Sequence, residues 1–179
     1  MNDQDHQHSE NCFFCRLIRD KESRDKESYR IVEWEEDEDY FAILPEKPKI
    51  SGHLLVVSKH PFNDITEMNA DSDETLSLLK AVVYWSKILK KCLHAEKVYV
   101  MTMCDHWDPE ELPKGQKETT EHLHFHLLPR YKTNRPERGE WFFTRKEENG
   151  FESRPFVLEK IKAYLTECKR RKRIKVGPT

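Results

Sequence analysis

Residues 121–130 read Glu121-His122-Leu123-His124-Phe125-His126-Leu127-Leu128-Pro129-Arg130. Successive side chains on a β-strand point to opposite faces, so this spacing places His122, His124 and His126 on one face and the apolar residues between them on the other. On a helix the three imidazoles would be spread around the cylinder and could not converge. We therefore expect a strand with one face in a core and the other presenting a row of imidazoles.

This row is a candidate catalytic or metal-binding site. An imidazole can act as a nucleophile, a proton carrier or a metal ligand near neutral pH. Scattered surface histidines are the alternative, but three in register beside an apolar face need partners, because burying unpaired polar groups is costly.

Length and composition predict one domain with solvated extensions. The chain has 179 residues, of which 36% are hydrophobic and 36% charged, so we expect disorder at both ends, including residues 1–10. The net charge of −2 argues against a wholly electrostatic nucleic-acid binder, although residues 33–39 form an acidic run and residues 169–173 a basic one.

The sequence favours a soluble, cytoplasmic protein without a membrane partner. Its first residues are polar and lack the apolar core of a signal peptide, and no later segment approaches the apolar length of a membrane span. Five cysteines, an odd number, suit a reducing compartment better than a disulfide framework.

Periodicity places the remaining elements. Residues 29–34, 40–44, 53–57 and 98–103 have the composition of strands. Asp71 and Glu74 have capping-box spacing and open a predicted helix that ends near Cys92. A last helix would carry on one face Val157, Ile161, Tyr164, Leu165 and Cys168. Strands before and after a helix predict an α+β fold with an antiparallel sheet.

The segment Cys12-Phe13-Phe14-Cys15 has three interpretations. It is a redox pair, half of a zinc site, or two ordinary buried cysteines. No βαβ pattern surrounds it, which disfavours thioredoxin-like chemistry, and a zinc site needs two further ligands from elsewhere in the chain.

These features resemble the histidine triad (HIT) family, whose signature His-x-His-x-His-x-x is matched from His122 to Leu128. The resemblance covers residues 11–131 and implies a HIT-like fold: a five-stranded antiparallel sheet with two main helices, usually in a homodimer. It divides the chain into a HIT domain at 11–135, a C-terminal extension with a helix at 136–168, and a basic tail at 169–179.

The family hydrolyses or transfers nucleoside monophosphates at the α-phosphorus. The resemblance implies that His124 is the nucleophile, which forms a nucleotidyl-histidine, and that His126 and His53 donate hydrogen bonds to the phosphate. Relatives that transfer nucleotides carry glutamine at the third triad position, so His126 favours a hydrolase. The implied substrate is a purine nucleotide as a phosphoramidate, a dinucleoside polyphosphate or an adenylylated conjugate.

In the zinc-bearing branch of the family, the metal has two N-terminal cysteines and two histidines as ligands. The matching residues are Cys12, Cys15, His60 and His122, and four protein ligands would make a structural Zn²⁺ site. His60 lies seven residues after His53, one fewer than the family spacing.

Two positions depart from the family pattern around the substrate. Pro45 stands where an aspartate usually binds the ribose, and the loop before the triad is longer, with Gln116 and Thr119 as the candidates for phosphate contacts. These departures keep open a nucleotide-binding or scaffold protein without catalysis.

The basic tail keeps open an enzyme that removes adenylate from nucleic-acid ends. Its simpler interpretation is a solvated helix end whose cations complement the helix dipole.

Overall fold

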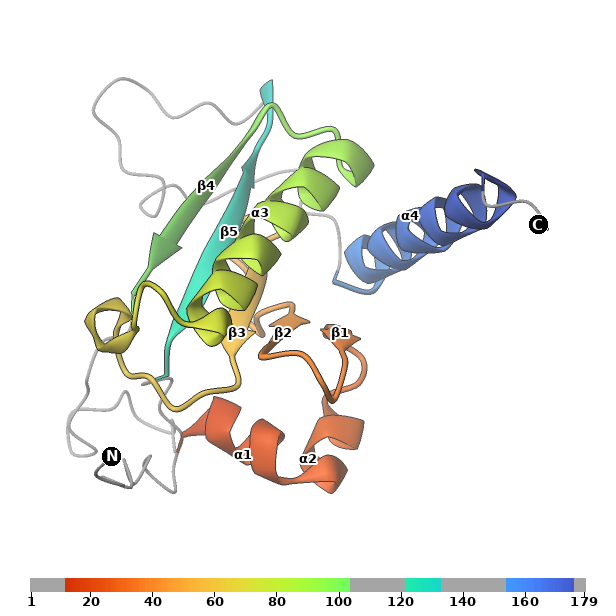
Figure 1. Ribbon diagram of the computed structural model, residues 1–179. Helices are drawn as coiled ribbons and strands as arrows, with labels where there is room; N and C mark the ends of the chain where they lie inside the picture. The colour runs from red at the N-terminus through yellow and green to blue at the C-terminus, as the bar shows by residue number, and fades with distance from the viewer. Residues whose placement is uncertain (1–11, 104–121, 133–153, 176–179) are drawn as a thin grey trace.

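The computed structural model describes residues 12–103, 122–132 and 154–175, with the backbone alone from residue 171 onward. The expectations for residues 1–10 and for Gln116 and Thr119 lie outside these ranges. Within them, one antiparallel sheet has helices against both faces (Figure 1). None of the helices in these ranges combines the length and apolar character needed to cross a bilayer.

The sheet confirms the predicted α+β fold with five antiparallel strands. Its strands are β1 (Ile31–Trp34), β2 (Tyr40–Ile43), β3 (Leu54–Ser58), β4 (Lys97–Thr102) and β5 (His124–Arg130). They lie in the order β1-β2-β3-β5-β4, and every neighbouring pair is antiparallel. The histidine strand β5 therefore lies inside the sheet, between β3 and the edge strand β4.

The register of β5 fixes which side chains share the histidine face. His124 pairs with Val57 and His126 with Leu55 on β3, and paired residues of antiparallel strands point to the same side. His122 lies just before the strand, where Leu123 donates its N–H to Phe62 O at 2.7 Å. The strand thus begins two residues later than the sequence predicted.

The apolar face of β5 packs against the long helix α3 (Asp73–Cys92). Trp85 and Leu89 of this helix are fully buried against Phe125 and Leu127. The helix begins one residue later than predicted, because the Ser72 hydroxyl, rather than Asp71, accepts the N–H of Thr75 as N-cap. The 3₁₀ turn η1 (Ile65–Glu67) precedes it.

Two short helices that the sequence analysis did not predict cover part of the histidine face. They are α1 (Phe13–Arg19) and α2 (Lys21–Lys26), which lie together below the sheet in Figure 1. Phe14 and Leu17 of α1 pack on Phe41 and Val57 of the sheet. This packing brings the two cysteines at the start of α1 toward the histidine strand.

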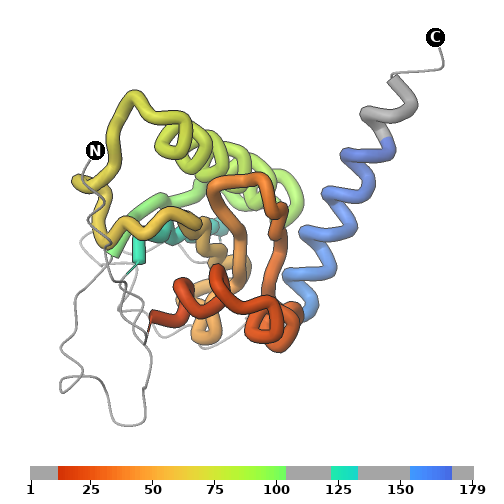
Figure 2. The backbone as a smooth tube through the Cα atoms, turned by 60° about the horizontal axis from the view of Figure 1, so that its bottom comes forward, coloured from red at the N-terminus to blue at the C-terminus, as the bar shows by residue number. Residues whose placement is uncertain are grey.

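The C-terminal helix α4 (Arg154–Lys175) starts against the body of the protein and then extends away from it (Figure 2). Val157, Leu158 and Ile161 of its first half are buried in the same core as α3. The basic run at 169–173 continues this helix, so the residues predicted as a tail are helical as far as Lys175.

A tight turn sets the start of β3. Gly52 has φ +80°, and a Cβ there would overlap the side chain of Leu93, so only glycine fits. The Tyr131 hydroxyl donates to Ser51 O at 3.0 Å and holds the turn to the end of β5. His53 is thereby placed directly before β3 and beside the histidine strand.

Candidate functional site

Three imidazoles, two from β5 and one from the residue directly before β3, form a row on the face that α1 partly covers. We call His53, His126 and His124 the imidazole row. His53 and His124 are 2% and 3% exposed. The ring centroids of His53 and His126 lie 5.1 Å apart, and those of His126 and His124 lie 4.7 Å apart. Phe14 closes one side, with its ring centroid 5.1 Å from that of His124. The structure thus brings together the three residues predicted as catalytic.

Hydrogen bonds join the row to the backbone at both ends. The Lys49 N–H donates to His53 Nδ1 at 3.1 Å. His53 Nε2 then lies 2.9 Å from His126 Nδ1, and His126 Nε2 lies 3.0 Å from His124 Nε2. Finally, His124 Nδ1 lies 2.7 Å from the carbonyl oxygen of His122.

The two backbone groups fix the proton on each ring. A backbone N–H can only donate and a carbonyl oxygen can only accept, so for neutral rings we assign the tautomers from the two ends inward. His53 accepts at Nδ1 and donates from Nε2, His126 accepts at Nδ1 and donates from Nε2, and His124 donates from Nδ1. His124 Nε2 is therefore the unprotonated nitrogen of the row.

Burial keeps the imidazole row neutral. It lowers the pKa of His53 to about 2, helped by the charges of His126, His124 and Lys49. Burial likewise lowers the pKa of His126 to about 3, with smaller effects of His124 and Lys49. The pKa of His124 is also lowered, chiefly by burial. Removing water from an imidazolium disfavours its charged form, so all three rings are neutral bases at physiological pH.

The geometry gives His124 and His126 different chemical capacities. His124 Nε2 carries a lone pair that can attack an electrophile, while its Nδ1–H is held by the His122 carbonyl oxygen. His126 offers one N–H at the same place, directed at His124 Nε2. A phosphate oxygen that accepts this N–H would free the nucleophile and bring phosphorus to it.

A second group, the sulfur end, lies beside the row and consists of Cys12, Cys15 and His122. Its three ligand atoms lie within 4.8 Å of one another, and all three residues are buried. His122 donates from Nε2 to Ser58 O at 2.7 Å, which leaves Nδ1 facing the Cys15 sulfur at 3.3 Å.

The acid–base state of the two thiols suits a soft metal. A hydrogen bond from Cys15 lowers the pKa of Cys12 to about 4 against the opposing effect of burial, whereas the bond to Cys12 together with burial raises the pKa of Cys15. One thiolate is thus already stabilised, and a metal would deprotonate the other thiol. Two sulfurs and one imidazole nitrogen are a donor set that Zn²⁺ prefers.

His60, the predicted fourth ligand, stands outside this three-residue group. Its Nε2 lies 3.0 Å from Asp39 Oδ1, and its backbone N–H donates to Ser58 Oγ at 3.0 Å. The carbonyl oxygen of the same Ser58 accepts from His122 Nε2. His60 therefore lies on the loop next to the sulfur end. Its role as a ligand stays a prediction.

Sequence reasoning missed three groups that shape the site. Phe14 was not distinguished from the cysteines that flank it, although its spacing to Leu17 and Ile18 is that of a helix face. Asp39 pairs with His60 across a gap of 21 residues, which no local pattern indicates. Lys49 acts through its backbone N–H, which every residue except proline carries, so it left no signal.

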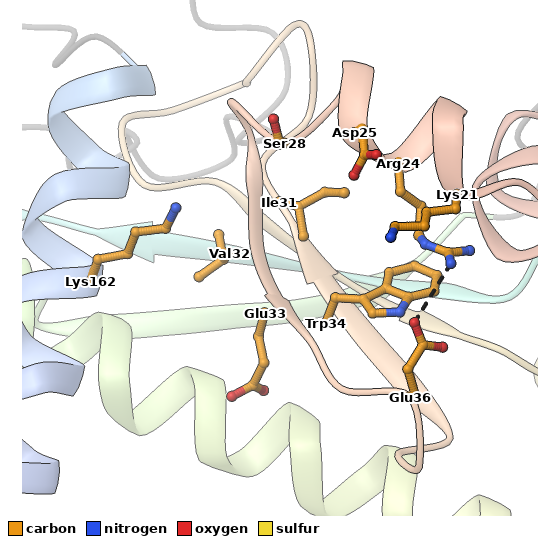
Figure 3. Close-up of a pocket in the computed structure, with 10 residues that line it drawn as sticks. All are labelled: Lys21, Arg24, Asp25, Ser28, Ile31, Val32, Glu33, Trp34, Glu36 and Lys162. Atoms are coloured by element: carbon orange, nitrogen blue, oxygen red, sulfur yellow. Dashed lines mark ion pairs between the residues drawn. The ribbon is translucent and has the colours of Figure 1, made fainter.

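A separate hollow lies between α2, β1 and α4, away from the histidines (Figure 3). It has a volume of about 380 Å³, and Trp34 forms part of its floor. Three cations and three carboxylates line it, and Arg24 pairs with Glu36 at 3.6 Å. The balanced charge gives no preference for an anionic or a cationic ligand.

Comparison with known proteins identifies the family. A family model described as the HIT domain matches residues 32–133, more than half of the chain. The chain belongs to the histidine triad (HIT) family. The matched range of the HIT domain contains all three members of the imidazole row and starts after the two cysteines of the sulfur end.

Individual relatives agree with this assignment. An uncharacterised HIT-like protein of Methanocaldococcus jannaschii is 31% identical over 120 residues, which cover 67% of this chain and 79% of the relative. A hypothetical histidine triad nucleotide-binding protein of Sulfolobus tokodaii superposes with a TM-score of 0.59 and 25% identity, covering 89% of this chain and 95% of that chain. A zinc-bound histidine triad protein of Mycobacterium smegmatis gives a TM-score of 0.57 and 24% identity, covering 89% and 96%.

Proposed function

We propose that the HIT domain hydrolyses a nucleotide conjugate at the α-phosphorus through a nucleotidyl intermediate on His124. The conjugate is a purine phosphoramidate, a dinucleoside polyphosphate or a related adenylylated compound. The hydrogen-bonded row that leaves His124 Nε2 unprotonated beside the His126 N–H carries this proposal. The relative of Sulfolobus tokodaii, described as nucleotide-binding, supports the substrate class.

In the first step the His124 Nε2 lone pair forms a bond to phosphorus, and the leaving group departs with the electron pair of its own bond to phosphorus. A phosphate leaves as an oxyanion, whereas an amine also takes up a proton from solvent. The Nδ1–H stays on His124, where the His122 carbonyl oxygen stabilises the positive charge of the ring. His126 donates its Nε2–H toward a phosphate oxygen, on which negative charge develops, and His53 orients that ring through the hydrogen bond to His126 Nδ1.

In the second step water replaces His124. The water oxygen bonds to phosphorus, the N–P electron pair returns to His124 Nε2, and a water proton is released to solvent. Splitting one displacement into two in this way lowers each barrier. Each ring keeps its single N–H through both steps, so the row returns to its starting tautomers.

A structural Zn²⁺ would fit the sulfur end. Cys12, Cys15 and His122 would hold it, with His60 as the fourth donor that the sequence predicts, and it would supply a crosslink that fixes α1 to the histidine strand. The neighbour from Mycobacterium smegmatis is described as zinc-bound. Phe14 lies between the two groups, with its ring centroid 6.0 Å from that of His122, so this crosslink would also support the imidazole row.

A homodimer in the cytoplasm completes the proposal. The edge strand β4 exposes Val100, and the outer side of α3 exposes Leu79, Val83 and Tyr84. Each of these two sets of exposed apolar side chains is a candidate contact for a second copy.

The test is to detect the intermediate by intact mass. The protein is mixed with adenosine and guanosine phosphoramidates and dinucleoside polyphosphates, then quenched in neutral denaturant because N–P bonds are acid-labile. We expect an adduct of one nucleoside monophosphate, absent in His124→Ala and retained in His94→Asn, which replaces an exposed histidine outside the site.

Continued release of monophosphate by His124→Ala would overturn the mechanism. Nucleotide binding without any adduct or monophosphate would favour the alternative of a binding or scaffold protein. Pro45, which offers no carboxylate to the ribose, would then be the first residue to examine.

A further inference from the structure

The second half of α4 leaves the body of the protein and carries a dense positive charge. Among the side chains that the structure describes, Leu165 is the last of α4 that packs against the core. Lys169 and Arg170 beyond it are exposed. The backbone stays helical as far as Lys175, and the helix extends away from the sheet (Figure 2). We call residues 169–175 the basic arm.

The basic arm lacks acidic residues of its own. Six of its seven residues are lysine or arginine. The sequence from 160 to 179 contains one carboxylate, Glu167, whose two oxygens accept from Arg170 at 2.8 and 3.0 Å. Like charges three and four residues apart on a helix repel each other, as the cations at 169 and 173 and at 171 and 175 do. This charge therefore costs helix stability unless an external anion offsets it.

The helix dipole accounts for part of the basic arm only. It favours cations in the last turn of a helix and falls off beyond that turn. The last turn here is residues 172–175, which hold three of the six cations. The other three, Lys169, Arg170 and Arg171, lie before it. A solvated helix end that complements the dipole thus explains about half of the charge.

Two polyanionic partners fit the basic arm poorly. The acidic run at 33–39 of a second copy is partly engaged within its own chain, because Glu33, Glu36 and Asp39 already contact Tyr40, Arg24 and His60. An anionic membrane binds helices that combine cations with an apolar face. The arm has Ile174 as its single apolar residue, so it has no such face.

Duplex DNA fits the basic arm better than the other nucleic acids do. Proteins hold single strands by stacking bases on aromatic side chains as well as by charge, and the last aromatic residue of the chain is Tyr164. The major groove of B-DNA is about 12 Å wide and admits an α-helix, whereas that of duplex RNA is deep and narrow. DNA also carries one negative charge per about 1.7 Å of its axis, a density that matches a helix of closely spaced cations.

We propose that the basic arm is a docking site for duplex DNA, which it binds through the phosphate backbone. Each cation that approaches a phosphate releases a counterion condensed on the DNA, so the affinity should fall steeply with salt. Phosphates beside the arm also offset the repulsion between its cations. This inference goes beyond the proposed function and stands whether or not the HIT domain is a hydrolase.

The test is fluorescence anisotropy of a labelled 20-base-pair DNA duplex with the full-length protein in 50 to 200 mM KCl. A duplex RNA and a single-stranded DNA of the same length are measured alongside it, together with vesicles that contain phosphatidylserine. Sedimentation velocity at 50 mM KCl reports on self-association.

Three variants of equal size separate the basic arm from the charge of the whole protein. The test variant replaces Arg171, Lys172 and Arg173 by glutamine. A charge-retaining variant replaces the two arginines by lysine. The matched control replaces three exposed lysines of α3 by glutamine, namely Lys80, Lys87 and Lys91. Circular dichroism and urea unfolding check that each variant is folded.

We expect log Kd of wild type for duplex DNA to rise with log salt with a slope of about 5, a loss of about 1,000-fold in affinity from 50 to 200 mM. The triple-glutamine variant of the arm should lower this slope by about 3 and weaken binding at 50 mM by at least about tenfold. The charge-retaining variant and the α3 control should keep a slope near that of wild type. Duplex RNA and single-stranded DNA should bind more weakly than duplex DNA.

Other outcomes overturn the inference. A salt slope of about 1 or less, or wild-type binding by the folded triple-glutamine variant, would show that the arm does not bind DNA. Tighter binding of single strands or of the vesicles than of duplex DNA would assign the arm to another partner. A dimer at 50 mM salt that the triple-glutamine variant dissolves would assign it to a second copy. The nucleotidyl adduct of His124 is measured separately, so the proposed function does not depend on any of these results.

Discussion

His122 and His124 are neighbours on the same side of one chain segment, yet they use opposite ring nitrogens. His122 donates from Nε2 to Ser58 O, which leaves Nδ1 for the Cys15 sulfur. His124 donates from Nδ1 to His122 O, which leaves Nε2 for His126. In each case a backbone carbonyl decides which nitrogen keeps its lone pair.

This difference separates two kinds of chemistry that the sequence pattern alone cannot separate. At the sulfur end, the unprotonated nitrogen of His122 faces the Cys15 sulfur and suits a metal. In the imidazole row, the unprotonated nitrogen of His124 faces the His126 ring and suits attack on phosphorus. The backbone carbonyl oxygen that accepts from each ring, rather than the residue type, assigns each histidine its role.

The largest effect is expected from removing one metal ligand of the sulfur end. Cys12→Ser should abolish Zn²⁺ binding and lower the free energy of unfolding by at least about 4 kcal/mol, the contribution of a ligand present at 1,000 times its Kd. Cys92→Ser, outside the group and only partly buried, is the control. Metal analysis with urea unfolding measures both quantities, and a Cys12→Ser protein that keeps stoichiometric zinc would contradict the assignment.

A smaller effect distinguishes the imidazole row from the sulfur end by the pH dependence of stability. The folded pKa of His126 is about 3, against an ordinary value of 6.5, so the unfolded chain binds more protons and stability falls as the pH drops below 6.5. Between pH 7 and pH 5 the contribution of His126 to this loss should be about 2 kcal/mol, and His53 and His124, whose pKa values are also lowered, add to the total loss of wild type. Urea unfolding of wild type and His126→Asn measures it.

The variant His126→Asn should lose about 2 kcal/mol less than wild type over this range. Any loss that arises at the sulfur end is common to both proteins and cancels in the comparison. Identical pH dependence in the two proteins would show that His126 is not held neutral by burial.

The smallest effect is expected at Phe14, which packs against both the imidazole row and the sulfur end. Phe14 contacts the rings of both His122 and His124, so Phe14→Leu should cost about 1 kcal/mol of stability. It should also weaken zinc affinity and turnover together, each by a few-fold. Competition with a chromogenic chelator measures zinc affinity, and steady-state kinetics measure turnover. A change in only one of these quantities would show that the sulfur end and the imidazole row are independent.

The alternation of residues 122–128 was enough to predict the histidine strand and its buried face, whereas the convergence of His53 with the triad was predicted from the resemblance to the HIT family. It succeeded because a two-residue period has one structural meaning when Leu123, Phe125 and Leu127 fill the gaps. The buried face of α3 could be predicted equally well, because Trp85 and Leu89 repeat at helical spacing.

The helices α1 and α2 were missed for different reasons. In α1 the apolar residues Phe14 and Leu17 lie beside Cys15, which was interpreted together with Cys12 as a possible metal ligand. In α2 nearly every residue is charged, and the helix depends on Asp20, whose carboxylate accepts the N–H groups of Glu22 and Ser23. Short polar helices of this kind depend on their caps and tertiary contacts more than on periodicity.

The roles of individual ring nitrogens could not be predicted at all. They depend on the carbonyls of Ser58 and His122 and on the N–H of Lys49, and backbone groups are present at every position of a sequence. The pairing of His60 with Asp39 likewise joins distant segments through a side-chain orientation that only the fold determines.

The most direct test of this account is the tautomeric state of the imidazole row. Long-range ¹H–¹⁵N correlation spectra of histidine-labelled protein distinguish Nδ1–H, Nε2–H and doubly protonated rings. We expect Nδ1–H for His124 and Nε2–H for His126 and His53, all three neutral at pH 7. A proton on His124 Nε2, or a charged ring in the row, would contradict the claim that this nitrogen is the nucleophile.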